Sequence, residues 1–173
     1  MKQFIHLRVK SSQRNNGLFG GGSTGSSSNV VDAYDTSLIR STPTALSLAR
    51  GYYLAGASVG DYALFGGGRT SSSSDVVDAY NTSLTRSTPT ALSVARYYLA
   101  GASVGDYALF GGGYTSSYSD VVDAYNTSLT RSTPTALSAG RAALAGASVG
   151  NYALFGGGNT DSVSGVVDVY EFS

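Results

Sequence analysis

The chain has 173 residues, 42% of them hydrophobic and only 13% charged, and its formal net charge is zero. This length suits one domain, and the abundance of Gly, Ser and Thr favours strands and turns over helices. The only lysines are Lys2 and Lys10, so no basic surface beyond the N-terminus could hold nucleic acid or an anionic membrane. No apolar run is long enough to span a bilayer. We therefore expect neither a nucleic-acid partner nor a membrane span.

Residues 1–17 precede the repetitive part of the chain. In residues 1–10, Ile5, Leu7 and Val9 alternate with polar side chains, which is the period of a strand and not the apolar core of a signal peptide. We expect this leader to form an additional strand. Without a visible secretion signal, the location stays open between the cytoplasm and a virion or cell surface.

The dominant feature is an internal repeat. The segment "YALFGGG" stands at residues 62–68, 107–113 and 152–158, and "LFGGG" stands at residues 18–22. Residues 64–108 match residues 109–153 at a period of 45 residues with seven mismatches, and the first copy carries one extra residue, Gly51. The array therefore divides into units 18–63, 64–108, 109–153 and a partial unit 154–173.

Each unit contains four short runs of β-branched and aromatic residues, separated by turn residues. In the third unit the runs cover residues 97–105, 107–112, 121–125 and 128–133. Gly105 and Asp106 between the first two runs predict a tight hairpin, because both tolerate turn conformations. Four strands in about 45 residues are typical of a β-propeller blade, and a parallel β-helix is the structural alternative. The sequence thus predicts an all-β fold of four-stranded antiparallel blades.

Several residues of the unit carry a family resemblance. A hydrophobic strand closes on Gly111 and Gly112, a polar loop follows, the next strand ends in Tyr125, and Arg141 precedes a small-residue strand. This order resembles a kelch repeat and is similar to repeat arrays of bacterial and bacteriophage surface or tail-associated proteins. The tryptophan of kelch units is absent, and Leu84 or Leu129 takes its place. The resemblance implies a propeller that binds partners through loops on one face.

The number of strands bears on how such a propeller closes. From Leu18 the chain offers fourteen strands, or about three and a half blades, which would leave strand edges exposed. We expect two or more copies to complete a ring as a homo-oligomer. The alternative is that the chain is a fragment of a longer array.

The glycine triplets could in principle serve chemistry, and the sequence argues against this. A phosphate-binding loop needs a lysine, and none follows Lys10; the dinucleotide motif needs a following helix, where Ser and Thr stand here. His6 is the single histidine, and there is no cysteine, which removes the usual nucleophile and metal-ligand sets.

The carboxylates give no stronger signal. A calcium site from Asp75, Asp120 and Asp161 is conceivable but lacks clustered ligands. The recurring pairs Asp78 with Arg86 and Asp123 with Arg131 are interpreted as ion pairs that tie strands together. We expect no enzyme activity, no cofactor and no metal.

The units differ most just after each glycine triplet. Equivalent positions hold Ser23, Arg69, Tyr114 and Asn159, and Tyr118 replaces a serine four residues after Tyr114. Serine and tyrosine are typical of adaptable recognition loops, so we predict these five residues as binding residues; the alternative is that they are solvated turns.

Two tyrosine pairs form a second candidate set. They open the expected innermost strands of two blades and become Ala142 and Ala143 in the last unit. They are predicted to line the mouth of the central channel or to pack between blades. The pairs are Tyr52 with Tyr53 and Tyr97 with Tyr98.

Together these features predict a non-enzymatic binding or structural module with a protein or glycan ligand. The alternative function is a glycan-binding adhesin or phage tail-associated recognition protein, in which Tyr114, Tyr118 and Arg69 contact sugar.

Overall fold

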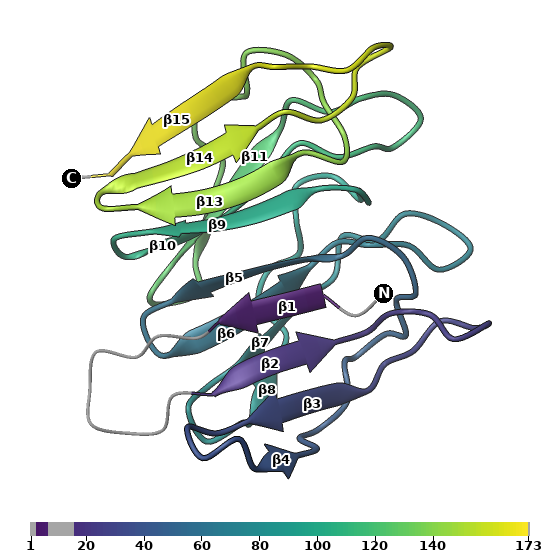
Figure 1. Cartoon of the computed structure of the whole chain (residues 1–173), viewed down its shortest axis with the longest axis vertical. Coiled ribbons are helices and arrows are strands. Elements are labelled where there is room, and N and C mark those ends of the chain that lie inside the picture. The colour runs from purple at the N-terminus through teal and green to yellow at the C-terminus, as the bar shows by residue number, and fades with distance from the viewer. Residues whose placement is uncertain (1–2, 7–15, 173) are drawn as a thin grey trace.

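A computed structural model describes residues 3–6 and 16–172 of the chain. These residues form fifteen strands and no helix, arranged as four antiparallel sheets that follow one another along the chain (Figure 1). We number them sheet 1 to sheet 4 from the N-terminus. The prediction of an all-β fold built from repeated antiparallel sheets is confirmed.

Each sheet takes its strands in chain order, so within a sheet every strand pairs only with its neighbours in sequence. Fourteen strands, β2 to β15, follow residue 16, and Gln3–His6 adds β1 as the first strand of sheet 1. The strands of sheets 1 and 2 are β1 (Gln3–His6), β2 (Gly17–Gly20), β3 (Val31–Tyr34), β4 (Arg40–Ser41), β5 (Ala55–Val59), β6 (Tyr62–Gly66), β7 (Val77–Tyr80) and β8 (Arg86–Ser87). Those of sheets 3 and 4 are β9 (Ala100–Val104), β10 (Tyr107–Gly111), β11 (Val122–Asn126), β12 (Arg131–Ser132), β13 (Ala145–Val149), β14 (Tyr152–Gly156) and β15 (Val167–Glu171).

Turn residues set the length of the strands. Val104 pairs with Tyr107 across a two-residue hairpin loop in which Gly105 has φ 53°, as the sequence predicts. After β7, the side-chain oxygen of Asn81 accepts hydrogen bonds from the backbone N–H groups of Ser83 and Thr85 at 3.0 and 2.9 Å. This Asx turn starts the connection to the outer strand, which has only two residues in each of sheets 1 to 3.

The glycine triplets are needed for close backbone contact between sheets. Gly112 and Gly113 have φ values of 66° and 110°, and a side chain on Gly112 would place its Cβ 2.6 Å from the carbonyl oxygen of Arg141. The N–H of Gly113 donates to that same oxygen at 2.8 Å. Only glycine fits a left-handed backbone at such a distance. The triplets therefore serve architecture.

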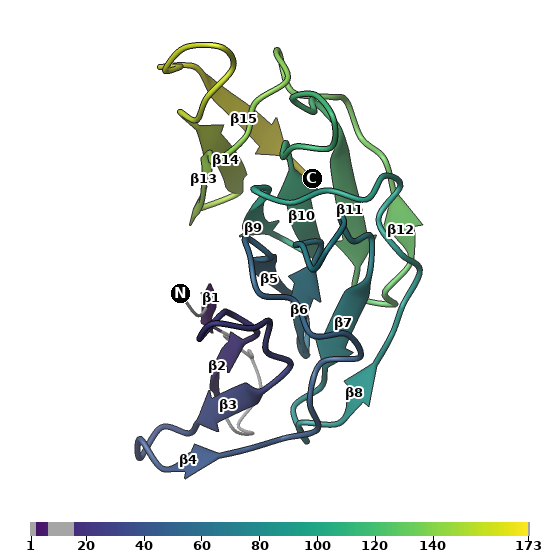
Figure 2. The ribbon, with the colours of Figure 1, turned by 90° about the vertical axis from the view of Figure 1, so that its right-hand side faces the viewer.

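The first strand of each sheet is also the innermost one, and Figure 2 shows these strands gathered on one side while β4, β8 and β12 fan outward. A Cβ on Gly101 would lie 2.1 Å from the carbonyl oxygen of Gly56, so β5 and β9 touch through their backbones. Nearby, the N–H of Ser58 donates to the Ser103 hydroxyl, and the N–H of Ser103 donates to the Ser148 hydroxyl, both at 2.9 Å. Small side chains are thus required along the innermost strands.

The hydrophobic cores lie between consecutive sheets. The core between sheets 1 and 2 contains Leu18 and Val31 from one sheet and Phe65 and Tyr80 from the next. The Phe65 ring lies 2.9 Å from the Cβ that Gly20 would carry, and it meets Tyr80 edge to face with centroids 6.0 Å apart. The same arrangement recurs in the next two interfaces, with Phe110 against Gly66 and Phe155 against Gly111. Each sheet is therefore stable only in contact with its neighbours.

Fully buried arginines connect each sheet to the next. Arg96, from the segment between β8 and β9, forms an ion pair with the buried Asp123 of β11 and also reaches the carbonyl oxygens of Val121 and Phe110. Arg50 with Asp78 and Arg141 with Asp168 repeat the pair in the other two interfaces. Burial lowers the pKa of Arg50 and Arg96, and the carboxylate partner opposes that shift.

Strand-to-strand ion pairs accompany the buried ones. Arg86 lies 3.3 Å from Asp78 and Arg131 lies 3.0 Å from Asp123, which confirms the two ion pairs predicted from the sequence. Asp78 and Asp123 therefore each pair with two arginines, one from the same sheet and one from the segment before it. The arginine from the preceding segment could not be predicted from the spacing of residues within one unit.

A tyrosine hydroxyl closes each interface at the outer side. The hydroxyls of Tyr80 and Tyr125 donate to the carbonyl oxygens of Thr44 and Thr90, both at 2.7 Å, and Tyr170 repeats the bond at 2.9 Å. Burial, followed by the charge of the nearby Asp168, raises the pKa of Tyr170 to about 12. The pKa of Tyr125 rises further for the same first reason.

Replacing Arg96 tests the buried connection. Arg96→Ala would leave the Asp123 carboxylate buried without its main partner, and we expect a loss of about 3–5 kcal/mol in the free energy of unfolding. Urea denaturation measures this loss. Arg40 is the matched control, because its side chain is 61% exposed and lies 3.7 Å from Asp32, so Arg40→Ala should cost only about 0–1 kcal/mol. Equal losses for the two variants would contradict the role given to Arg96.

The tyrosine hydroxyls predict a loss of stability at alkaline pH. Unfolded tyrosines ionise near pH 10, whereas the folded protein holds Tyr170 protonated to about pH 12, so the folded state binds more protons between these values. Stability is therefore complete below about pH 10 and falls as pH rises through the pKa of the folded state. Urea midpoints between pH 8 and 11 should show this fall, and Tyr125→Phe should make it shallower. A flat profile would contradict the assignment.

Candidate functional site

Six tyrosines form a continuous line where the glycine-triplet loops of sheets 2 and 3 emerge. We call Tyr52, Tyr53, Tyr97, Tyr98, Tyr114 and Tyr118 the tyrosine row. Tyr53 and Tyr98 stack with ring centroids 3.7 Å apart, which joins the two sheets. Successive centroids elsewhere along the row are 5.9 Å apart for Tyr52 and Tyr53, 5.1 Å for Tyr98 and Tyr97, 5.8 Å for Tyr97 and Tyr114, and 5.3 Å for Tyr114 and Tyr118.

Backbone pairing inside sheet 3 brings distant parts of the unit together. Tyr97 stands before β9 and Tyr114 follows β10, and their backbones exchange two hydrogen bonds at 3.1 and 2.7 Å. Tyr114 also pairs with Tyr118 across the loop that follows the glycine triplet. The tyrosine pair and the variable loop, expected as two separate candidate sets, thus meet in one place.

Hydrogen bonds between sheets fix the second tyrosine of each pair. The N–H of Tyr98 donates to the Tyr53 carbonyl at 3.1 Å, and the N–H of Ala143 donates to the Tyr98 carbonyl at 2.9 Å. All three residues have φ values between 54° and 58°, so this left-handed backbone belongs to the repeat and not to tyrosine. A hydrogen bond with Tyr53, followed by burial, raises the pKa of Tyr98 to about 12.

One charged side chain borders the row. The Arg69 guanidinium lies 5.0 Å from the centroid of the Tyr97 ring and donates to the Tyr97 hydroxyl at 3.2 Å. Its backbone N–H donates to the Tyr52 carbonyl at 2.9 Å. Arg69 therefore occupies in sheet 2 the place that Tyr114 occupies in sheet 3.

The row ends in a hollow of about 510 Å³, which we call the tyrosine pocket. It opens where the third tyrosine pair of the series is replaced by Ala142 and Ala143, because two methyl groups leave the space that two phenol rings fill in sheets 2 and 3. Asn159, the residue of sheet 4 equivalent to Tyr114, adds an amide to the wall. The lining residues are Tyr97, Tyr98, Tyr114, Tyr118, Ala142, Ala143 and Asn159.

The predicted binding residues divide into three groups in space. Five of them line the tyrosine pocket, and Arg69, Tyr52 and Tyr53 extend the same surface across sheet 2. Ser23 lies in the loop of sheet 1, where it pairs with Ser27, and it is not among the described residues that line the pocket. The five lining residues are Tyr97, Tyr98, Tyr114, Tyr118 and Asn159.

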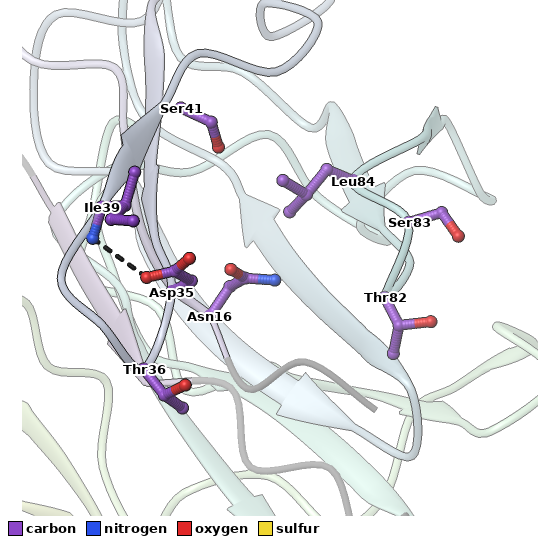
Figure 3. A pocket seen from close by; sticks show the side chains of 8 residues that line it. All are labelled: Asn16, Asp35, Thr36, Ile39, Ser41, Thr82, Ser83 and Leu84. Carbon is purple, nitrogen blue, oxygen red and sulfur yellow. Dashed lines mark hydrogen bonds between the residues drawn. The ribbon is translucent and has the colours of Figure 1, made fainter. Parts of the chain in front are cut away.

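A second hollow, of about 420 Å³, lies near the turns of sheets 1 and 2, and none of the residues predicted to bind a ligand lines it (Figure 3). Asn16 stands there at the position that Tyr62 and Tyr107 hold in the next sheets, since each lies two residues before a Leu-Phe-Gly segment. Tyr62 packs against the core between sheets 2 and 3, whereas the Nδ2 of Asn16 has no hydrogen-bond partner among the described residues. Its lining residues are Asn16, Asp35, Thr36, Ile39, Ser41, Thr82, Ser83 and Leu84.

The described residues contain no group of three or more His, Cys, Asp or Glu side chains placed to hold a metal ion. Within the same residues, no helix has the length and apolar character needed to cross a membrane. The tyrosine pocket instead offers aromatic faces, phenol hydroxyls and one amide. These groups are suited to non-covalent binding.

One comparison with known proteins bears on the fold. No family model matches the chain, and no curated protein matches its sequence. Among solved structures, the β-propeller protein YjhT is similar to this chain with a TM-score of 0.71 and 15% sequence identity, over 96% of this chain. The match covers 64% of YjhT, so this chain spans less than two thirds of that protein. At this identity the likeness shows the fold alone, a propeller-like array of antiparallel sheets.

Filling the second hollow tests its origin. Asn16→Tyr restores the residue of the other sheets, and we expect it to raise the free energy of unfolding by about 1–2 kcal/mol through burial of the ring. Asn16→Ala is the control, because it removes the amide without filling the space. Urea denaturation of both variants makes the comparison. A destabilising Asn16→Tyr would show that the hollow is not the space of a missing tyrosine.

Proposed function

We propose that the chain is a non-enzymatic binding module built on kelch-like propeller blades, and that the tyrosine pocket is its ligand site. The observation that carries this proposal is the pocket itself, in which four tyrosine rings and Asn159 converge where an otherwise regular repeat changes its sequence.

The chemistry of the row supports binding over catalysis. Tyrosine presents a large flat surface together with a hydroxyl, and it loses little conformational entropy when a ligand immobilises it. Tyr97 and Tyr98 are already held by their ring contacts and backbone hydrogen bonds, so the pocket is organised before a ligand arrives. Acid or base catalysis near neutral pH would need a group whose pKa is shifted toward neutrality, whereas the pKa of Tyr98 is raised away from it and the wall otherwise offers phenols and an amide.

A glycan is the second candidate, and the row of rings favours it. Aromatic side chains stack on the apolar C–H face of a sugar ring, while the Asn159 amide and the Arg69 guanidinium can bond to its hydroxyl groups. An extended row of this kind fits successive sugar units of a chain better than one compact molecule. We propose this role as that of an adhesin or a phage tail-associated recognition protein.

Self-association is the last part of the proposal. Four sheets of one chain match 64% of the length of YjhT, and further copies of the chain would complete a ring. A partner protein could bind the loops that follow the glycine triplets whether the chain is a monomer or part of a ring.

Glycan-array binding followed by calorimetry tests the ligand site. We expect Tyr114→Ala and Tyr118→Ala each to weaken glycan binding about tenfold or more, equivalent to about 1.4 kcal/mol, because each removes one stacking surface. Ser73→Ala is the matched control, since Ser73 holds the position of Tyr118 in the neighbouring loop. If the protein binds no glycan on the glycan array, the result would contradict the glycan candidate. Turnover of a bound sugar by the wild-type protein would contradict the non-enzymatic role.

A further inference from the structure

One face of sheet 4 exposes side chains whose equivalents in sheets 2 and 3 are buried. We call the face formed by Val149, Leu154, Gly156, Val167 and Val169 the terminal face. Val149, Val167 and Val169 are 61%, 54% and 57% exposed. Their equivalents in sheet 3, which are Val104, Val122 and Ala124, are at most 3% exposed.

The three interfaces within the chain show what normally covers such a face. In each of them a phenylalanine of the following sheet lies over a glycine, with the ring 2.9–3.0 Å from the Cβ that Gly20, Gly66 or Gly111 would carry. At Gly156 the nearest described atom is Cγ2 of Val167, at 3.5 Å and in the same sheet. The glycine seat for a phenylalanine is therefore present on sheet 4, and no following sheet within the described residues covers it.

Sheet 1 presents the matching surface on its opposite side. We call the face formed by Gly17, Phe19, Asp32 and Tyr34 the first face. Phe19 and Tyr34 meet edge to face with centroids 5.8 Å apart at 84°, as Phe65 and Tyr80 do at 6.0 Å and 87° in sheet 2. Phe19 and Tyr34 are partly exposed, whereas the sheet 2 pair is buried. The first face thus carries the aromatic pair that covers a glycine seat in each internal interface.

Each face differs from the repeat at one residue, which is smaller on the first face and larger on the terminal face. Gly17 stands where the later sheets carry Ala63, Ala108 and Ala153, so the first face has lost a methyl group. Val169 stands where the earlier sheets carry alanine, so the terminal face has gained two methyl groups. Ala63 and Ala33 belong to one core cluster, which puts these two positions in the same interface. The methyl group lost on one face offsets part of the volume gained on the other when the faces meet.

We infer that the terminal face binds the first face of a second copy of this chain. The contact continues the interface that already repeats three times within each chain, with Phe19 of one copy over Gly156 of the other. Such a head-to-tail contact uses two different surfaces, so successive copies form a closed ring where the rotation per sheet permits and an open filament where it does not. This inference rests on the self-association part of the proposed function and is independent of the ligand that the tyrosine pocket binds.

The mass of the full chain in solution provides the first test. We expect sedimentation velocity at micromolar concentrations to show association, and Val169→Asp to weaken it at least tenfold by placing a charge in the apolar contact. Val163→Asp is the matched control, because Val163 is a 92% exposed valine of sheet 4 in the loop after the glycine triplet. A wild-type protein that stays monomeric, or a Val169→Asp variant that associates as the wild type does, would overturn the inference.

Mixing two variants establishes the direction of the contact. Gly17→Asp impairs the first face, at a position where the other sheets accept a Cβ, and we expect this variant to be monomeric too. An equimolar mixture with Val169→Asp retains one intact pair of faces and should form dimers. A mixture that stays monomeric would overturn the head-to-tail arrangement. If Gly17→Asp does not fold, the Val169→Asp protein is mixed with the wild-type protein instead. It should lower the average mass, because a copy without a working terminal face ends a growing assembly. An unchanged average mass would overturn the arrangement.

The same samples keep this result separate from the ligand site. Val169→Asp leaves the tyrosine pocket untouched, so its glycan binding per site should equal that of the wild type. Loss of association with retained binding therefore concerns the terminal face alone, and loss of binding in Tyr114→Ala with retained association concerns the pocket alone.

Discussion

The buried arginine between consecutive sheets is the interaction on which the rest of the structure depends. Arg96 uses its guanidinium to reach an aspartate and two carbonyl oxygens of the next sheet, while its own carbonyl accepts the N–H of Gly68 in the preceding one. A buried ion pair of this kind is strongly destabilising when one partner is removed, so it holds the two sheets in one register. The glycine triplet must be bare because the arginine carbonyl approaches it, and the loops that follow the triplet are placed as a consequence.

The candidate functional features arise where one repeat differs in sequence from the others. The tyrosine pocket opens because Ala142 and Ala143 replace a tyrosine pair, and the second hollow opens beside Asn16, which replaces another tyrosine. Val169 instead adds volume to a face that no following sheet of the described residues covers. In a stacked array each unit contacts only its two neighbours. A change in side-chain size within one unit therefore produces a cavity or a protrusion at that place.

The same dependence on neighbours explains why the two ends of the array differ from its middle. Internal sheets bury both faces, with side chains such as Leu64 and Leu109 fully inaccessible to solvent. Sheet 4 carries the same strand sequence "YALFG" in β14, yet the outward-facing residues of this strand are exposed or only partly buried. Burial in this protein is thus a property of the place in the array and not of the local sequence.

The sequence by itself determined the class of fold, the strands and the turns. A 45-residue period with four apolar runs specifies an antiparallel sheet, because strand pairing within a unit joins neighbours in sequence and depends on local turn chemistry. Ion pairs within one sheet, such as Asp123 with Arg131, followed from the same local spacing. The candidate residues were also visible as departures from the repeat, although Asn16 was overlooked because it stands just before the first unit.

Only the tertiary structure decided how units contact one another. The pairing of Arg96 with Asp123, the stacking of Tyr53 on Tyr98 and the convergence of Tyr97 with Tyr118 all join residues separated by a loop or a whole unit. Their meeting depends on the stacking distance and twist between sheets, which a period alone does not give. A repeat reveals that its copies are alike, whereas the shape of a pocket depends on how those copies are packed.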